Sequence, residues 1–182
     1  SSASRIANIL SSFKFNRSLT ASSTESTFSS TIQSFSILNE HIESANNLSG
    51  YNVGDEFTIN MCDFGTHTLR IANKSTPSEC SNNDFSQTAC GFVLEFKDII
   101  TTHNMNSQGT NVGGWEASEM RSYLNTDILG AMPQDLQSVI IDTKVVSGYG
   151  KNDANGTGKD GNWVSEKDKL YLLFLFLYPN TY

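Results

Sequence analysis

The side chains best suited to hold a ligand gather around two polar loops, 103–114 and 148–162. Both loops are rich in Asn and Gly, and each is followed at once by a tryptophan. Aromatic rings beside amide, imidazole and guanidinium groups can stack on a polar ligand and hydrogen-bond to it. We therefore predict a ligand-binding surface formed by His103, Asn104, Asn106, Trp115, Arg121 and Trp163.

Structural roles for the same residues stay open. His103 can be a solvated loop residue. Arg121, on the helix expected after Trp115, can stack on the indole or hold an acid in the core. His67 falls in a predicted strand, where we expect a packed or surface residue rather than a ligand. The carboxylates of the helix that carries Arg121 are expected to be surface charges.

Signatures of catalysis and of metal binding are weak or missing in the sequence. The three histidines share no metal-binding spacing, and no G-x-S-x-G or Cys/His signature occurs. Asp153-x-Asn155-x-Thr157-Gly158 begins like a calcium loop, but Val164 stands where the bidentate acid belongs. We predict no catalytic residue, no bound metal and no cofactor.

The three cysteines suggest one disulfide. Cys80 and Cys90 bracket a polar loop, so a bond between them would staple that loop in an oxidising compartment. The alternative is three reduced cysteines packed as small apolar groups. We expect Cys62 to be buried and free.

Composition excludes some partners and favours export. The formal net charge is −7, which is not the basic footprint of a nucleic-acid binder and disfavours an anionic membrane surface. No stretch reaches the roughly 18 apolar residues needed to span a bilayer. Charged residues make up only 17%, so the polar surface is mostly Ser, Thr and Asn, which suits an extracellular or cell-surface protein.

Residues 1–48 form a Ser/Thr-rich segment that we predict to be helical. Apolar residues recur at helical spacing from Ile6 to Phe13, and more strongly between Phe28 and Ile42. The second stripe predicts a helix over 24–46 that either packs on its own domain or joins copies of the chain into a homo-oligomer. Acids and bases balance within the first 50 residues, so the whole net charge lies in the rest of the chain.

Residues 49–182 read as an α+β domain. We predict strands at 57–61, 66–71, 91–96, 141–146 and 169–177, a helix at 116–124, and a second helix starting at Pro133. Strands interrupted by one pair of short helices are typical of this fold class.

The segment from Gly114 to Asn125 has the spacing W-x-x-S-x-x-R-x-x-L-N, carried by Trp115, Ser118, Arg121, Leu124 and Asn125. With Val53-Gly54-Asp55, the step from Leu136 to Lys144 and the strand Asp168-Lys169-Leu170-Tyr171-Leu172-Leu173, it resembles the bacterial domain-of-unknown-function family numbered six-two-seven-three. The resemblance covers about residues 51–173.

The resemblance implies a C-type-lectin-like fold, shared with formylglycine-generating-type proteins, and an exported or surface protein of Gram-positive bacteria. It implies no established activity. We read the five signature residues as fixing the loop–helix corner, with Asn125 capping the end of the helix. The chain departs from the family after Leu173, where an apolar run replaces the usual second half. We therefore expect the N-terminal half of the family domain only, from a truncated or frameshifted product.

These observations predict an exported or surface-associated binding or assembly module whose partner is a carbohydrate or a protein at the cell surface. Two alternatives stay open. One is an enzyme of the formylglycine-generating-like fold group that uses Cys80 or Cys90. The other is a pilin-like assembly subunit.

Overall fold

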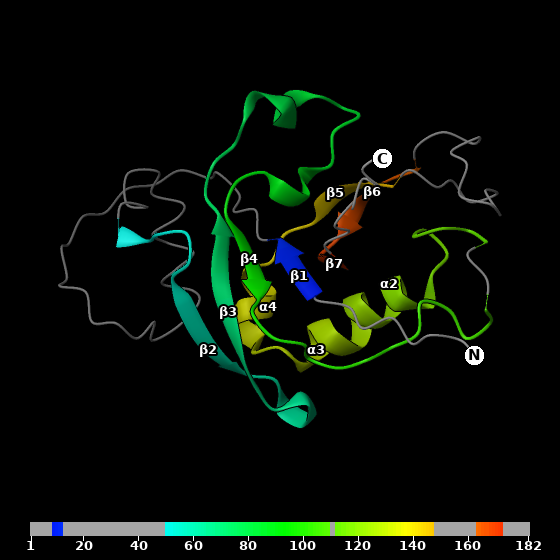
Figure 1. Cartoon of the computed structure of the whole chain (residues 1–182), viewed down its shortest axis with the longest axis horizontal. Coiled ribbons are helices and arrows are strands. Elements are labelled where there is room, and N and C mark those ends of the chain that lie inside the picture. The colour runs from blue at the N-terminus through cyan, green and yellow to red at the C-terminus, as the bar shows by residue number, and fades with distance from the viewer. Residues whose placement is uncertain (1–8, 13–49, 110–111, 148–162, 173–182) are drawn as a thin grey trace, which may run out of the picture.

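The computed structural model describes residues 9–12, 50–109, 112–147 and 163–172 (Figure 1). Its centre is a five-stranded antiparallel sheet with the order β2-β3-β4-β1-β7, and a second sheet pairs β5 with β6. The strands are Ile9–Ser12 (β1), Glu56–Asn60 (β2), Thr66–Asn73 (β3), Val93–Phe96 (β4), Thr143–Ser147 (β5), Trp163–Asp168 (β6) and Leu170–Leu172 (β7). The predicted α+β class is confirmed.

Strands β2 and β3 form a hairpin whose alternation sets one face against the core. His67, Leu69 and Ile71 on β3 are buried, while their neighbours along the strand are more exposed. Successive side chains of a strand point to opposite faces, so this pattern leaves a polar face turned to solvent. The turn between the strands is a short 3-10 helix, Cys62–Phe64.

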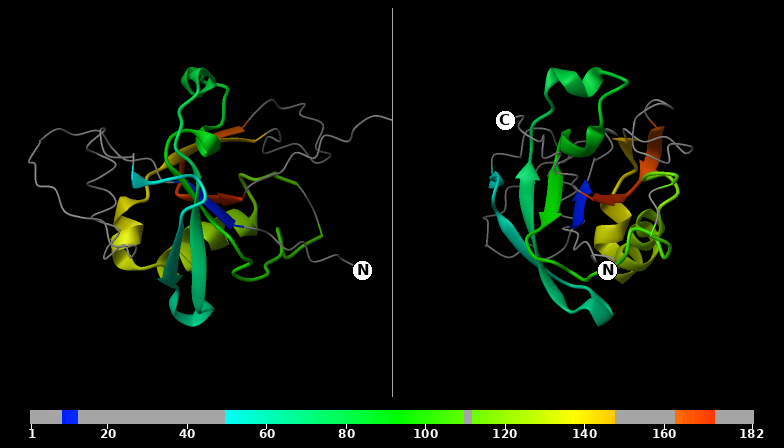
Figure 2. Two further views of the ribbon diagram at one scale, coloured as in Figure 1. Left: turned by 60° about the vertical axis from the view of Figure 1, so that its left-hand side comes forward. Right: turned by 45° about the vertical axis from the view of Figure 1, so that its right-hand side comes forward.

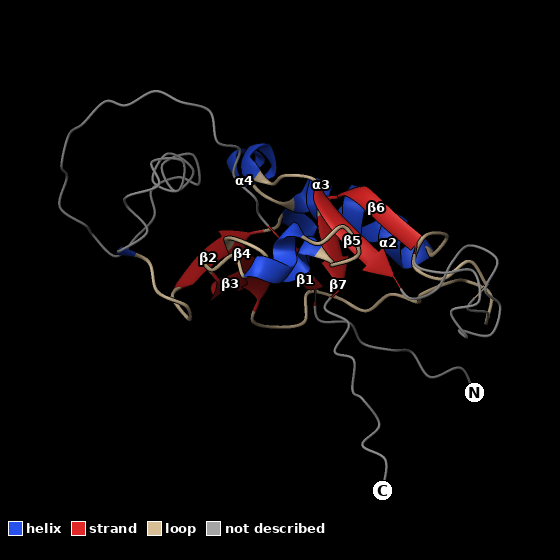
Figure 3. Cartoon of the chain, turned by 90° about the horizontal axis from the view of Figure 1, so that it is seen from above, coloured by secondary structure: helices blue, strands red, loops and turns tan. Residues whose placement is uncertain are grey.

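The helices lie along one side of the five-stranded sheet (Figures 1 and 3). The α-helix Glu119–Tyr123 (α2) continues through a π-helical stretch, Leu124–Ile128, into Leu129–Ala131 (α3), and Gln134–Val139 (α4) follows. Apolar side chains of these helices and of the sheet share one core, which includes Leu69, Leu94, Met120, Leu124, Ile128, Leu136 and Leu170.

Strand β1 corrects the sequence prediction for the start of the chain. Ile9–Ser12 form a strand between β4 and β7, not part of a helix. So short a run of apolar residues, even at helical spacing, does not decide between helix and strand, and pairing with the edges of β4 and β7 decides the outcome. The predicted helix at 24–46 lies outside the described residues.

Between β3 and β4 the chain makes an excursion, residues 74–92, that reaches the second sheet (Figure 2). The Asn73 side-chain amide donates to the carbonyls of Ala89 and Gly91, and the Gly91 amide donates to the Ser75 carbonyl at 2.8 Å. The Ser86 hydroxyl accepts from the Val146 amide on β5, at 3.3 Å. The excursion is therefore tied at its base and again where it meets β5.

Strand β6 was not predicted from the sequence, which gave a loop at 148–162 and a last strand that began at 169. Its sequence is largely polar, and β5 supplies the pairing, with Ser147 opposite Trp163 and Thr143 opposite Asp168. The calcium-like motif at 153–158 and the apolar run after 172 lie outside the described residues. Of the predicted final strand, Leu170–Leu172 is observed as β7, and all three residues are buried.

Candidate functional site

A hollow of about 370 Å³, open to solvent, lies between the loop after β4 and the start of α2. It is lined by Thr102, His103, Asn104, Ser107 and Glu119. All five side chains can hydrogen-bond, and one is an aromatic ring. The arrangement therefore suits a small polar ligand or a polar group of a larger one.

His103 is held by two contacts. Its ring stacks on that of Tyr123, with centroids 4.1 Å apart and planes 13° from parallel. Its Nδ1 lies 2.7 Å from the Asn104 carbonyl oxygen, which makes Nδ1 the donor. The stack fixes the orientation of the imidazole beside the hollow.

The next residues of the loop cap the start of α2. The Met105 carbonyl accepts from the Met120 amide at 3.1 Å, and the Asn106 side chain accepts from the Glu119 amide at 3.2 Å. Ser107 donates from its amide and its hydroxyl to the Glu119 carboxylate, at 2.9 and 2.6 Å. The first two bonds satisfy amides that a helix start leaves without internal partners, and the two from Ser107 add a link to a side chain of the helix, so together they hold the loop against α2.

On the far side of α2, Ser118 and Trp115 form the corner where the loop turns into the helix. The Ser118 hydroxyl accepts from the Arg121 amide at 3.1 Å and lies 3.0 Å from the Trp115 carbonyl, to which it donates. Ser118 is the N-cap of α2 and is buried. Its role is the one that hydroxyl residues commonly play at helix starts.

Asp168, at the end of β6, accepts hydrogen bonds from Trp115 and Arg121 of this corner. Its carboxylate accepts from Trp115 Nε1 at 2.8 Å, from Arg121 Nε at 2.8 Å and from a terminal guanidinium nitrogen at 2.6 Å. The Asp168 side chain is 1% exposed, against 27% for Arg121. Removing one partner from a buried, hydrogen-bonded ion pair leaves a charge without compensation, which is strongly destabilising.

Asn125 joins the helix to the last two strands. Its amide nitrogen donates to the carbonyls of Arg121 and Leu170, at 3.0 and 2.9 Å. Its oxygen accepts from the amides of Lys169 and Leu170, at 2.9 and 3.0 Å. The predicted helix cap is therefore wrong, because the helix runs on past Asn125 and its side chain instead holds the junction of β6 and β7.

The structure separates the predicted ligand residues. His103 and Asn104 line the hollow, while Asn106 is used as a cap of α2. Trp115, 2% exposed, belongs to the core.

The guanidinium of Arg121 pairs with the carboxylate of Asp168. Of the two structural roles considered for Arg121, pairing with an acid in the core is therefore the one observed. Trp163 is the first residue of β6.

Three lining residues were missed by sequence reasoning. Thr102 and Ser107 lie in a polar loop that gives no pattern, and Glu119 was treated as a surface charge. Ser107 and Glu119 are 12 residues apart in the sequence, so no short-range pattern predicts their contact.

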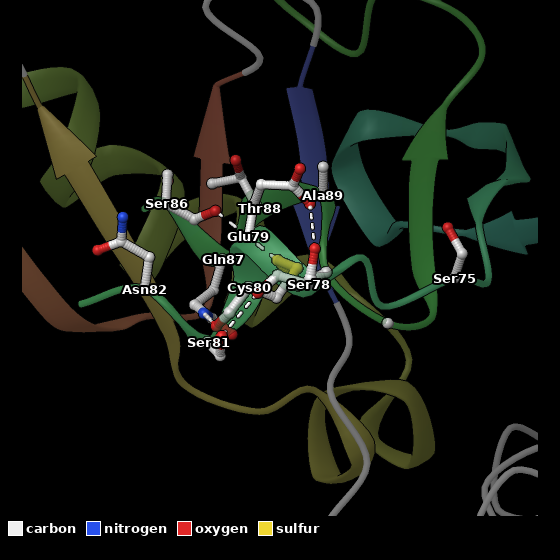
Figure 4. The surroundings of a disulfide bond; sticks show 12 residues. Ser75, Ser78, Glu79, Cys80, Ser81, Asn82, Ser86, Gln87, Thr88 and Ala89 are labelled. Atoms are coloured by element: carbon white, nitrogen blue, oxygen red, sulfur yellow. Dashed lines mark hydrogen bonds between the residues drawn. A yellow bond between two sulfur atoms is a disulfide. The ribbon is translucent and has the colours of Figure 1, made fainter. Parts of the chain in front are cut away.

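The cysteines divide into a pair and a free thiol. Cys80 and Cys90 are joined by a disulfide that closes the excursion (Figure 4). In that state neither sulfur is a thiol, so a role as a reactive cysteine would first require reduction of this bond. Cys62 is free but exposed, not buried as expected, because it sits at the tip of the β2–β3 turn with a positive φ of 50°.

His67 is a buried residue of β3 that is paired with Asp98, a partner that the sequence did not predict. Its Nδ1 lies 2.9 Å from Asp98 Oδ2, and its Nε2 lies 2.8 Å from the Phe64 carbonyl. Burial opposes the charge of Asp98, but the hydrogen bonds from His67 and from the Thr68 amide and the attraction to His67 outweigh it, so the pKa of Asp98 lies below its usual value.

Within the described ranges, no group of three or more His, Cys, Asp and Glu side chains is placed to hold a metal ion. None of the helices in the same ranges is both long and apolar enough to cross a bilayer.

Residues 91–175 match the model of the family described as "Domain of unknown function (DUF6273)". This confirms the resemblance for that segment, which carries β4, the helices and β5 to β7, whereas Val53-Gly54-Asp55 lies before the match. No curated protein and no solved structure matches the chain. The C-type-lectin-like fold therefore stays a prediction.

Proposed function

We propose that this chain is an exported or cell-surface binding module and that the hollow beside α2 receives a carbohydrate. The observation that carries the proposal is the lining itself: hydroxyl, amide, imidazole and carboxylate groups, with the His103 imidazole held by stacking on Tyr123. Sugars offer hydroxyl groups that pair with such donors and acceptors, and ring faces that lie against an aromatic edge or plane.

Preorganisation supports the same function. The loop residues that follow His103 are fixed to α2 by four hydrogen bonds, from Met105 to Ser107. Because these bonds already hold the loop, ligand binding would spend little free energy on ordering it. The hollow is open to solvent, so we expect weak binding to a single sugar and tighter binding where many copies meet many sugars.

The disulfide supports the location. Bonds of this kind persist outside the cytosol and are rare within it. A thiol titration in intact cells that produce the protein tests this directly. One reactive thiol per chain, Cys62, is expected before reduction and three are expected after reduction and unfolding. Three reactive thiols before reduction would contradict export.

Binding is tested on an array of bacterial and host glycans, with the unaltered chain, His103→Ala and Asn104→Ala. We expect a defined set of bound glycans whose signals fall at least several-fold in both variants. Asn83→Ala is the matched control for Asn104→Ala, because it removes the same amide from the exposed part of the disulfide loop and should keep every signal.

Signals that are equal in all four chains would place recognition elsewhere. No bound glycan, together with His103-dependent capture by a purified surface protein, would favour a protein partner.

A further inference from the structure

Strand β1 fills a slot whose two walls do not pair with each other. β1 is antiparallel to β4 on one side, with Leu10 opposite Glu95, and to β7 on the other, with Leu10 opposite Tyr171. The sheet order places β1 between these strands, so among the described strands only β1 pairs with both the β2-β3-β4 part of the sheet and β7 (Figures 1 and 2).

The walls of the slot cannot stand empty in water. Val93 and Leu94 on β4 are 3% and 1% exposed, and Leu170 and Tyr171 on β7 are 0% and 1% exposed. Without a strand between them, both walls would present unpaired backbone amides and carbonyls next to apolar side chains. The slot therefore requires a strand, but the requirement does not specify which copy of the chain supplies it.

The strand comes from a separate part of the chain. Residues 13–49 separate β1 from Gly50, and a chain of this length spans at most roughly 130 Å when fully extended. The family match, residues 91–175, contains both walls and does not contain β1. The slot is thus a feature of the matched domain, and the strand that fills it is supplied by a different segment.

We propose that the slot between β4 and β7 also accepts the β1 strand of a second copy of this chain, so that copies join by strand exchange. A strand from another copy makes the same backbone pairs in the same register as the chain's own strand. The exchange therefore replaces each contact within a chain by an identical contact between chains. The balance between the two arrangements then depends on local concentration, which is high where many copies occupy one surface. This assembly does not depend on ligand binding in the hollow.

Cysteine cross-linking between copies tests the exchange. Leu10→Cys and Glu95→Cys are made in separate full-length chains, one of them isotopically heavy, both with Cys62→Ser so that no free thiol remains. The two chains are incubated together at high concentration and then oxidised mildly. We expect a covalent product of one light and one heavy chain, at twice the 20.0 kDa of a single chain.

Thr58→Cys in place of Glu95→Cys is the control for random collision, because Thr58 is exposed on β2, at the opposite edge of the sheet. A light–heavy product several-fold above this control supports the proposal, and a product equal to it overturns the proposal. The double variant Leu10→Cys/Glu95→Cys must also form a cross-link. If that cross-link is intramolecular at every concentration, the strand stays in its own slot and the proposal is wrong.

A second measurement covers the case in which the cysteine chains do not fold. Light and heavy unaltered chains are mixed and followed by native mass spectrometry. We expect mixed dimers that disappear with Leu10→Pro, because proline lacks the amide that a central strand needs. Absence of mixed dimers, or dimers that persist with Leu10→Pro, would overturn strand exchange.

Discussion

The two sides of helix α2 use the same kinds of side chain for different purposes. On one side, Trp115, Arg121 and Asn125 turn their polar atoms to Asp168 and to the β6–β7 junction, in the interior. On the other, His103 and Glu119 border a hollow that is open to solvent. We call these regions the Asp168 corner and the hollow.

This difference shows that a conspicuous sequence motif can identify a fold without marking its binding site. The sequence predicts Trp115 and Arg121 of the W-x-x-S-x-x-R-x-x-L-N pattern to be ligand residues, yet both are hydrogen-bonded to Asp168 within the fold. The residues that face solvent in the hollow belong to no motif. The pattern therefore identifies the domain, and the loop that it supports carries the candidate recognition surface.

The largest expected effect is a loss of folding stability when the Asp168 corner is disrupted. Asp168→Ala leaves the Trp115 N–H and the Arg121 guanidinium without their buried acceptor, so we expect a loss of about 3–5 kcal/mol in the free energy of unfolding. Urea denaturation measures it. Asp84→Ala, an exposed acid in the disulfide loop, is the control and should change stability by less than about 0.5 kcal/mol. Equal small losses in both variants would break the comparison.

Asn125→Ala should cost less, about 2–3 kcal/mol, because it removes four hydrogen bonds but no buried charge. Asn125→Asp keeps the oxygens that accept from Lys169 and Leu170 and loses the donors to two carbonyls. We expect it to be destabilising as well, since a carboxylate would face those carbonyls. If Asn125→Asp is as stable as the unaltered chain in urea denaturation, the donor half of the clamp is unimportant.

Ser107→Ala sharpens the account of the hollow. It removes one hydroxyl bond to the Glu119 carboxylate and keeps the amide bond, at an exposed site, so the expected loss of stability is about 0.5–1 kcal/mol. Amide hydrogen exchange of residues 103–107 should quicken while the Asp168 corner is unaffected. Faster exchange that spreads to residues 168–170 would show that the two regions are one unit.

The smallest effect depends on pH and concerns Asp98. Because its pKa is lowered in the fold, its ionised form stabilises the protein above the ordinary aspartate pKa, and this contribution is lost as the pH falls through the lower folded value. Asp98 is half exposed, so screening keeps the contribution to a few tenths of a kcal/mol. The stability difference between the unaltered chain and Asp98→Asn, measured by urea titrations, should shrink below that pKa. A difference that grows in acid would contradict the sign.

Sequence reasoning reached the fold class and the hairpin of β2 and β3, because their alternation and turn residues are local signals. It failed at β1, where pairing with distant strands decides the conformation, and at β6, whose polar sequence shows no strand pattern. The site divides in the same way. An acid partner for Arg121 was one of two structural alternatives, but Asp168 lies 47 residues away and only the fold brings it near. Likewise, the role of Asn125 depends on Lys169 and Leu170, which no spacing connects to it.

The central claim is that the signature residues form a structural unit around Asp168. A double-mutant cycle of Trp115→Phe and Asp168→Asn in urea denaturation tests it most directly, because Phe keeps the ring and removes only the N–H donor. The account predicts a coupling of about 1–3 kcal/mol between the two substitutions. Losses that add to within about 0.3 kcal/mol would mean that the Trp115–Asp168 bond does not hold the corner, and the claim would be wrong.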